Sequence, residues 1–397
     1  MPMKTKNLLK TMALTLTLLL AGKVGWGQPL LYEDFNYPTP AYIGGNGDAG
    51  SSSNNWTTHS VTPGQTTTID INYGSLTYPG LEVSSGNKVY LFSNDKATSR
   101  DVNREFTSTD SVLYYSALIT IIDNSQINET GDYFMHFGAS SGSSVTVFGG
   151  RLGIKSVNSG SNFRFCIQNT SGGKPTFTDN GTDLSFGTTY LVVVKYDIST
   201  KPTNAYLWVN PSTLGGAEPS GYVLNTSGTT TFSQFASICL RNTPTTPKAY
   251  IDEIRVGKTF ADVTPKETQP PAIVTASLLP VDDATNVSIS TTLTIPFDEK
   301  IQKGTGFVRI KKVSDDSEVF AIDVNSSAVS ITNETATVSM PSNLDYSTDY
   351  YVNIDAGAFK DLVNNDFAGL NDKTTWNFRT ADPDVTAPGW TATYPKV

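Results

Sequence analysis

The feature that most constrains the fold is a series of short runs rich in Val, Ile, Tyr and Phe, separated by clusters of Gly, Asn, Ser and Asp. Such runs are typical of β-strands, and the clusters between them are typical of turns. Helix-forming stretches are sparse, so the sequence predicts an all-β protein. At 397 residues the chain is longer than one hydrophobic core usually serves, and we expect two domains.

The first predicted domain covers residues 28–265. Its runs are numerous enough for a two-sheet jelly roll, in which the first and last strands usually lie side by side. The expected strands lie at 30–37, 111–123, 132–139, 162–169, 188–197, 204–211, 235–242 and 249–257.

A linker at 266–271 leads to the second predicted domain, residues 272–381, whose strand spacing is that of an Ig-like β-sandwich. Leu344 precedes Tyr350 by six residues, which predicts a tyrosine corner in which the hydroxyl binds the backbone of a crossover loop. We expect Trp376 in the core of this domain.

The sequence predicts an export signal at the start of the chain and a repeated segment at its end. Three lysines precede an apolar run at 12–20 that is too short to span a bilayer, so residues 1–27 read as an export signal. Residues 382–397 resemble the start of the second domain and predict a further, truncated repeat. We therefore expect a secreted or cell-surface protein that continues beyond Val397.

The charge balance excludes some partners. Without residues 1–27 the chain has 24 basic and 37 acidic residues, a net charge of −13. Nucleic acid and anionic membranes would be repelled over most of the surface, so we expect neither nucleic-acid binding nor membrane insertion. We expect the modules to be monomeric.

In the stretch AYIDEIRVG at 249–257, Asp252 shares one face of the expected strand with Ile254. A carboxylate therefore lies on a face that is otherwise apolar. Asp252 is a catalytic acid, a metal ligand or a buried polar group. Its neighbour Glu253 points to the opposite face, so the two do not form a glycosidase pair, and we expect Glu253 to be solvated beside Arg255.

A second acid, Glu33 in LLYEDFNY, interrupts an apolar phase in the same way. If the first and last strands pair, Glu33 and Asp252 converge, and two buried carboxylates repel unless a cation lies between them. Oxygen-only ligation would suit a structural Ca²⁺. The alternatives are that each acid accepts hydrogen bonds from backbone N–H groups or an arginine, or that Asp34 is the ligand in a bulged strand.

Aromatic residues predict a sugar-binding surface. Tyr206 and Trp208 face away from the apolar side of NAYLWVNP, with Asn210 beside them, and offer a stacking platform. Trp56, on a polar loop, is a second candidate ring. The alternative is that the rings at 206 and 208 pack under a loop or against the second domain.

Other reactive residues give weaker signals. Cys166 and Cys239 each alternate with an arginine, so each should face away from its strand's apolar side, and a disulfide between neighbouring strands is one possibility. His59 and His136 lie too far apart in sequence to favour a zinc site or a catalytic triad. The stretch at 361–372 is interpreted as an ordered turn and not as a calcium loop.

Two resemblances extend this interpretation. The stretches LTIPFDEKIQKGTGFVRIKK, LDYSTDYYVNIDAGAFKDLVNNDFAGL and TTWNFRTAD closely resemble the SbsA-type bacterial Ig-like domain. That resemblance implies a repeated spacer of exported proteins, without chemistry of its own.

The stretches LYEDFNY, GTTYLVVVKYD, AYLWVNP and YIDEIRVGKTFADVTP resemble concanavalin-like or laminin-G-like jelly rolls of exported Bacteroidota proteins. That resemblance implies a carbohydrate-binding or adhesive module, and in some relatives a structural calcium between the terminal strands.

We therefore expect an exported, non-catalytic protein in which a jelly-roll domain recognises a glycan or a cell-surface component on an Ig-like stalk. One alternative is that these modules are accessories of a secreted polysaccharide hydrolase whose catalytic domain lies beyond Val397. Another is that the protein is purely structural.

Overall fold

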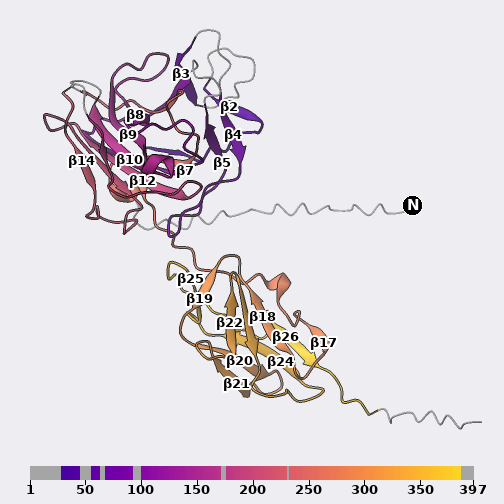
Figure 1. The fold of residues 1–397 in the computed structure, drawn as a ribbon. Coiled ribbons are helices and arrows are strands. Elements are labelled where there is room, and N and C mark those ends of the chain that lie inside the picture. The colour runs from indigo at the N-terminus through magenta and orange to yellow at the C-terminus, as the bar shows by residue number, and fades with distance from the viewer. Residues whose placement is uncertain are drawn as a thin grey trace, which may run out of the picture.

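The computed structural model describes residues 28–44, 55–62, 68–92, 100–170, 176–229 and 232–385. The predicted export signal at 1–27 and residues 386–397 of the predicted further repeat lie outside the described residues. The fold is all-β, as predicted, and consists of a two-sheet jelly roll followed by an Ig-like sandwich (Figure 1). No helix in the described part of the chain is long and apolar enough to cross a membrane.

The jelly roll contains a nine-stranded sheet in which the first and last strands pair, as predicted. Its strands, in spatial order, are β14 (Val223–Asn225), β13 (Asn204–Val209), β12 (Thr189–Asp197), β7 (Val112–Ile121), β16 (Ala249–Gly257), β5 (Asn87–Leu91), β4 (Ile69–Tyr73) and β2 (Ala41–Ile43), with β1 (Leu31–Glu33) paired to β16.

The opposing sheet has seven strands, which are antiparallel throughout. Their spatial order is β11 (Thr178–Asp179), β10 (Asn162–Thr170), β9 (Phe148–Val157), β8 (Asp132–Gly138), β15 (Ser237–Asn242), β6 (Arg100–Glu105) and β3 (Trp56–Val61). A short 3-10 turn, η1 (Asn158–Gly160), joins β9 to β10.

Apolar side chains of the two sheets meet in one large core. The nine-stranded sheet also has a smaller apolar cluster on its outer face, where α1 (Phe260–Val263) covers β7, β12 and β13. Thr259 caps this helix in a reciprocal capping box with Asp262, which fixes the short helix on the sheet.

The last strand contains a β-bulge that the sequence pattern did not reveal. Its pairing with β7 shifts register between Asp252 and Arg255, and Glu253 adopts φ +53°. The bulge reverses the alternation, so Ile251 and Ile254 both enter the core between the sheets. Asp252 instead lies opposite Leu118, on the outer face. The prediction that Asp252 shares a face with Ile254 was therefore wrong.

The Ig-like domain has its own core and three small sheets. A 3-10 turn, η2 (Thr275–Ser277), lies near the start of this domain. The strands are β17 (Ala284–Val287), β26 (Asn377–Thr380), β24 (Asp349–Ile354), β20 (Phe307–Lys312) and β21 (Glu318–Asp323) in one sheet, β18 (Thr292–Pro296), β23 (Thr335–Ser339) and β22 (Val329–Thr332) in the second, and β19 (Ile301–Lys303) with β25 (Phe359–Asp361) in the third.

The predicted tyrosine corner is present. The backbone N–H of Asp345, directly after Leu344, donates to the hydroxyl oxygen of buried Tyr350 at 3.0 Å. Trp376 is fully buried, as predicted, and its indole N–H donates to the carbonyl of Pro280 at 2.8 Å.

The two cysteines are free and buried. Both face away from the core between the sheets, as predicted, but they do not lie on neighbouring strands. Cys166 is on β10 and Cys239 on β15, with β9 and β8 between them. Adjacent strands lie about 4.8 Å apart, so this separation is too large for a disulfide.

Candidate functional site

Asp252 and Glu253 hold the loop at 74–86, which joins β4 to β5, against the last strand of the jelly roll. Asp252 accepts hydrogen bonds from the N–H of Leu76 at 2.7 Å and from the N–H of Glu253 at 2.7 Å. Burial raises the pKa of Asp252 to about 8. Glu253 accepts from the N–H of Ser85 at 3.2 Å. The two acids therefore fix both ends of one loop, which is a structural role.

Glu253 is not solvated as predicted, because only 1 % of its surface is exposed. Its predicted contact with Arg255 is present, at 2.7 Å, and the hydroxyl of Tyr32 donates to it at 2.9 Å. Burial raises the pKa of this carboxyl, and Arg255 opposes the shift. Both acids of this strand are thus engaged by protein groups.

Glu33 joins the two sheets of the jelly roll. Its carboxylate accepts from the N–H of Phe35 at 2.9 Å, the hydroxyl of Tyr37 at 2.9 Å and the indole N–H of Trp56 at 2.8 Å, and it forms an ion pair with Arg104. Because Glu33 belongs to β1 while Trp56 and Arg104 belong to β3 and β6, the carboxylate connects opposite layers.

The structure does not bring Glu33 and Asp252 together. Glu33 points between the sheets with Leu31 and Phe35, whereas Asp252 lies on the outer face of the same sheet. Each carboxylate has its own donors. The arrangement that the resemblance implied, a calcium ion between the terminal strands, does not fit these two residues.

The predicted sugar platform is covered by protein. Trp208 is 1 % exposed, donates to the carbonyl of Pro219 at 2.9 Å and packs against Phe260 of α1, with ring centroids 5.3 Å apart. Tyr206 stacks on Trp208 and meets Tyr222 edge-on at 5.2 Å. The alternative that these rings pack under a loop describes the structure, and Trp208 presents no free ring face.

The remaining predicted ligand residues also have structural positions. Asn210 is exposed, but its side-chain oxygen accepts from the N–H of Leu191 at 3.0 Å and its φ is +50°. Trp56 is 3 % exposed and stacks on Phe35 in the core between the sheets. The predicted platform residues therefore do not form a shared surface.

A different polar surface lies on the outer face of the seven-stranded sheet. Alternate residues of β6, β15, β8, β9 and β10 point away from the core and carry polar side chains, most of them buried. The register of the paired strands places these residues beside one another on adjacent strands. They are Asp101, Asn103, His136, Arg151, Gln168 and Arg241.

Tyr133 lies between two arginines on this face. The guanidinium carbon of Arg151 is 3.4 Å from the ring centroid of Tyr133, and that of Arg241 is 4.4 Å away. Arg241 pairs with Asp132 at 2.8 Å. Arg151 donates to the side-chain oxygen of Gln168 at 2.8 Å. Stacking on an aromatic ring stabilises both cations and fixes their planes.

Several buried polar atoms on this face have no hydrogen-bond partner. They come from four of the seven strands: Thr170 Oγ1 on β10, Arg151 Nε on β9, Asp101 Oδ1 on β6 and His59 Nε2 on β3. Folded proteins leave few such atoms, and each calls for an explanation such as a water, an ion or a ligand. Other unpartnered buried atoms lie elsewhere, such as Nη1 of Arg255 on β16, but these four lie on the same sheet face as the two stacked arginines, and we take this face as the candidate site.

Burial keeps the two histidines of this region uncharged near neutral pH. It lowers the pKa of His136 to about 3 and that of His59 to about 4. The Asn103 amide nitrogen lies 3.1 Å from His59 Nδ1 and also donates to the carbonyls of Thr57 and Gly142. Burial also raises the pKa of Asp101 to about 6.

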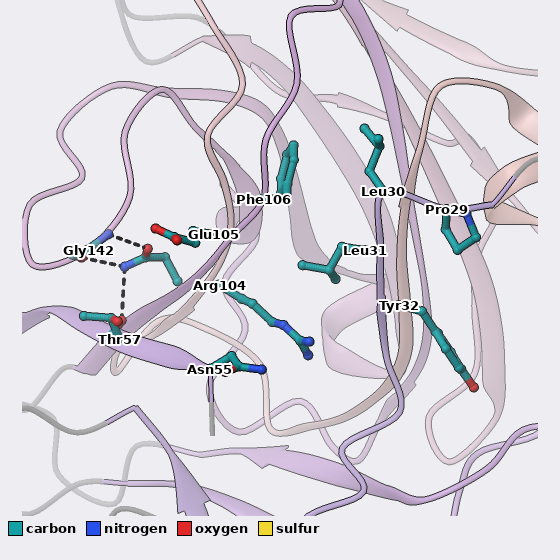
Figure 2. A pocket seen from close by; sticks show the side chains of 11 residues that line it. Pro29, Leu30, Leu31, Tyr32, Asn55, Thr57, Arg104, Glu105, Phe106 and Gly142 are labelled. Carbon is teal, nitrogen blue, oxygen red and sulfur yellow. Dashed lines mark hydrogen bonds between the residues drawn. The ribbon is translucent and has the colours of Figure 1, made fainter. Parts of the chain in front are cut away.

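A cleft of about 630 Å³ adjoins this face. Figure 2 shows Arg104 reaching between Asn55 and the residues of β1, with Thr57 and Gly142 on the opposite wall. Asn103 belongs to both surfaces, because it lines the cleft and also contacts His59. The volume is within the range typical of ligand sites.

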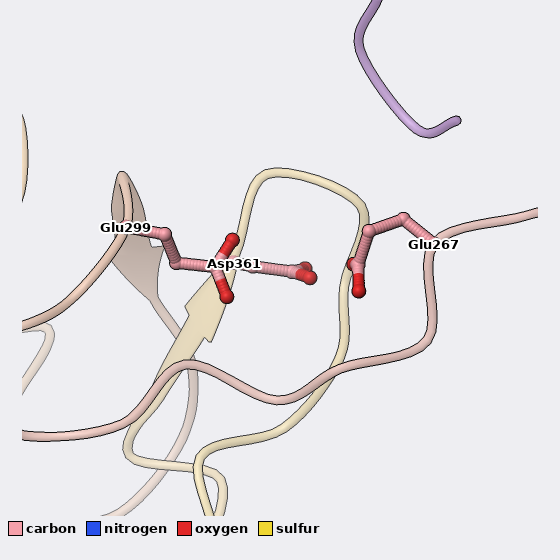
Figure 3. A group of neighbouring side chains, drawn as sticks. All are labelled: Glu267, Glu299 and Asp361. Atoms are coloured by element: carbon pink, nitrogen blue, oxygen red, sulfur yellow. The ribbon is translucent and has the colours of Figure 1, made fainter. Parts of the chain in front are cut away.

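An acidic cluster lies where the linker meets the Ig-like domain. Carboxylate oxygens of Glu267, Glu299 and Asp361 lie within 4.8 Å of one another, and Figure 3 shows the three side chains approaching each other. Asp361 also accepts from the N–H of Asn365 at 2.7 Å, within the ordered turn that the sequence predicted. Oxygen ligands of this kind suit a hard cation such as Ca²⁺.

This cluster predicts a pH-dependent stability. Burial, with Asp361 and Glu267 nearby, raises the pKa of Glu299 from 4.5 to about 7. A group with a raised folded-state pKa stabilises fully below pH 4.5 and loses that contribution as the pH rises to 7. Glu299→Gln is therefore expected to stabilise the Ig-like domain by about 1–3 kcal/mol at pH 8, with no gain at pH 4.

Urea unfolding of a chain of residues 28–397 at both pH values measures this effect, with Glu334→Gln, an exposed glutamate of the same domain, as the matched control. Equal changes in the free energy of unfolding of the two variants would contradict the expected repulsion among the three carboxylates. If Ca²⁺ stabilises the unsubstituted protein at pH 8 but not Glu299→Gln, an ion occupies the cluster.

Comparisons with known proteins identify the second domain. Residues 267–380 match the family of bacterial Ig-like domains, which confirms the Ig-like domain predicted at 272–381. No curated protein matches the chain.

Several solved structures resemble the chain distantly. An endo-β-1,4-glucuronan lyase from the fungus Trichoderma reesei is 13 % identical over 60 % of this chain and 100 % of its own, with a TM-score of 0.34. An endo-1,3-β-glucanase from Streptomyces sioyaensis is 14 % identical over 59 % and 97 %, with a TM-score of 0.31. The carbohydrate recognition domain of Emp46p is 10 % identical over 51 % and 88 %, with a TM-score of 0.29.

Proposed function

We propose that residues 28–265 recognise an extracellular glycan on the outer face of the seven-stranded sheet and in the adjoining cleft. The Ig-like domain acts as the spacer that presents this domain at or beyond the cell surface. The observation that carries the proposal is the set of buried, unpartnered polar atoms on that face. The role is binding without catalysis.

The chemistry of the unpartnered atoms matches a ligand rich in hydroxyl groups. Arg151 Nε is a donor, Asp101 Oδ1 is an acceptor, and His59 Nε2 donates or accepts according to its tautomer. A sugar hydroxyl both donates and accepts, so neighbouring hydroxyls on one glycan satisfy both kinds. The atoms span β10 to β3, a width that favours an oligosaccharide over a single sugar.

A glycan array with the mature chain, followed by calorimetry on the best ligand, tests the proposal. Asp101→Ala removes an unpartnered acceptor and is expected to weaken binding at least about tenfold, since a hydrogen bond to a charged group contributes about 1.5–3 kcal/mol. Asp70→Ala, an exposed acid on β4 of the other sheet, is the matched control and should bind normally.

Two results would overturn this function. If the mature chain binds no glycan, the jelly roll serves as scaffold or as a protein-binding module. If it releases new reducing ends from a bound polysaccharide, the domain is catalytic and the binding role is replaced.

A further inference from the structure

Arg151 is a buried cation that forms no ion pair with a carboxylate of the described residues. Only 9 % of its surface is exposed; it donates to the neutral side chain of Gln168, and a hydrogen bond with Tyr133 and the more distant carboxylate of Asp132 also favour its charged form. Four other arginines of the jelly roll, Arg104, Arg164, Arg241 and Arg255, each have a carboxylate partner. Arg151 lies at the centre of the candidate site.

A buried charge normally requires a partner. Removing a guanidinium from water costs several kcal/mol, and an opposite charge or a full set of hydrogen bonds usually offsets this cost. Stacking on Tyr133 offsets part of it, because a cation over an aromatic face gains about 0.5–2 kcal/mol. Gln168 contributes one hydrogen bond. The remaining unfavourable energy is what an anionic ligand would relieve.

The free edge of the guanidinium has the geometry for such a ligand. Nη1 is engaged by Gln168, and Nε has no partner. Together with Nε, Nη2 forms the side of the fork that binds two oxygens of one anion. Tyr133 holds the plane of this fork across the strands, so the edge is oriented before a ligand arrives.

The two acids of this region, Asp132 and Asp101, lie beside Arg241, and neither forms an ion pair with Arg151. Arg241 and Asp132 neutralise each other as an ion pair. His136 is uncharged at neutral pH because burial lowers its pKa to about 3. Asp101 is the other acid near Arg241, and it has no ion pair with Arg151. The two arginines and the two acids of this region therefore balance in formal charge, and Arg151 is the cation among them that has no ion pair to a described residue.

We propose that the Nε and Nη2 atoms of Arg151 bind the anionic group, a carboxylate or a sulfate ester, of a glycan lying across the seven-stranded sheet. This inference rests on the proposed function and adds the class of glycan. Hydroxyl groups of the same glycan form hydrogen bonds with Asp101 and His59, and Arg151 binds the charged substituent.

Binding of three polymers to the mature chain tests the inference: polygalacturonate for carboxylates, dextran sulfate for sulfate esters and dextran as the neutral polymer. We expect binding to at least one anionic polymer and at least tenfold weaker binding of that polymer by Arg151→Met. Arg151→Lys should recover part of the affinity, because it keeps the charge but loses the fork. Arg164→Met, an ion-paired arginine on the same face, is the matched control.

Thermal unfolding separates ligand binding from a structural role. Arg151→Met replaces an unpaired buried charge by an apolar side chain of similar length, so its melting temperature should equal or exceed that of the unsubstituted protein. A structural arginine would instead lower it on replacement.

The outcomes distinguish the two proposals. Unaltered anionic-polymer binding by Arg151→Met, or recognition of neutral glycans alone on the array, would overturn the anion inference and leave glycan recognition standing. No binding to any glycan or polymer would overturn both. Preference between the two anionic polymers identifies the charged group.

Discussion

Replacing Glu33 by alanine is expected to lower the free energy of unfolding of the jelly roll by about 3–5 kcal/mol. The substitution leaves Arg104 without its carboxylate and removes the acceptor for the indole of Trp56 and the hydroxyl of Tyr37. Truncating one member of a buried pair costs more than the pair itself contributes, because the other charge stays desolvated. The loss is large because Glu33 connects both sheets.

Urea unfolding of a chain of residues 28–397, with the jelly-roll transition resolved from that of the Ig-like domain, measures this loss. Glu33→Gln retains an acceptor oxygen and should lose less. Asp34→Ala, the adjacent and partly exposed acid, should change the stability by less than about 1 kcal/mol. Equal losses at positions 33 and 34 would show that the carboxylate does not hold the sheets together.

The fold was largely predictable because it depends on patterns that are local in sequence. Alternation with a period of two identified eight of the sixteen strands that the described part of the jelly roll contains, and the pairing of the terminal strands follows from the jelly-roll topology. The corner formed by Tyr350 could be predicted because its spacing from Leu344 is fixed by a crossover loop. Each of these features depends on residues close in the chain or on a general rule of topology.

The interpretation of Asp252 failed because alternation does not reveal a bulge. The backbone of Glu253 has a positive φ, which residues other than glycine rarely adopt, and no residue in this stretch of the sequence indicates it. One extra residue exchanges the two faces, so an apparently buried core acid becomes an anchor for an external loop. A slip of one residue is enough to move a candidate metal ligand to the wrong side of a sheet.

The candidate site was missed because its residues are brought together only by strand order. His136 has no second histidine near it in the sequence, so no metal or catalytic site was predicted there. Arg151 and Gln168 are polar residues within otherwise apolar runs and were not predicted to belong to a site. The available signal was a polar side chain at alternate positions of strands that carry few charges, in YFMHFG, GGRLGI and FCIQN. Register pairs Arg151 with Gln168, a contact that sequence spacing does not show.

Replacing Trp208 by alanine is expected to destabilise the jelly roll by about 3–5 kcal/mol and to leave glycan binding unchanged at temperatures where the variant stays folded. The indole fills the outer apolar cluster between β12 and α1, against Val193 and Phe260. Its removal creates a cavity and leaves the helix without its largest contact. The candidate site lies on the other sheet, so the ligand does not meet this ring.

Chemical unfolding and calorimetry on the same preparation measure the two effects. Trp208→Phe should recover more than half of the lost stability, since an aromatic ring refills most of the space. Tyr73→Ala, an aromatic residue that is 76 % exposed, should change the stability by less than about 0.5 kcal/mol. Loss of glycan binding with normal stability in Trp208→Ala would restore the sugar-platform role that the sequence pattern predicted and move the binding site to the nine-stranded sheet.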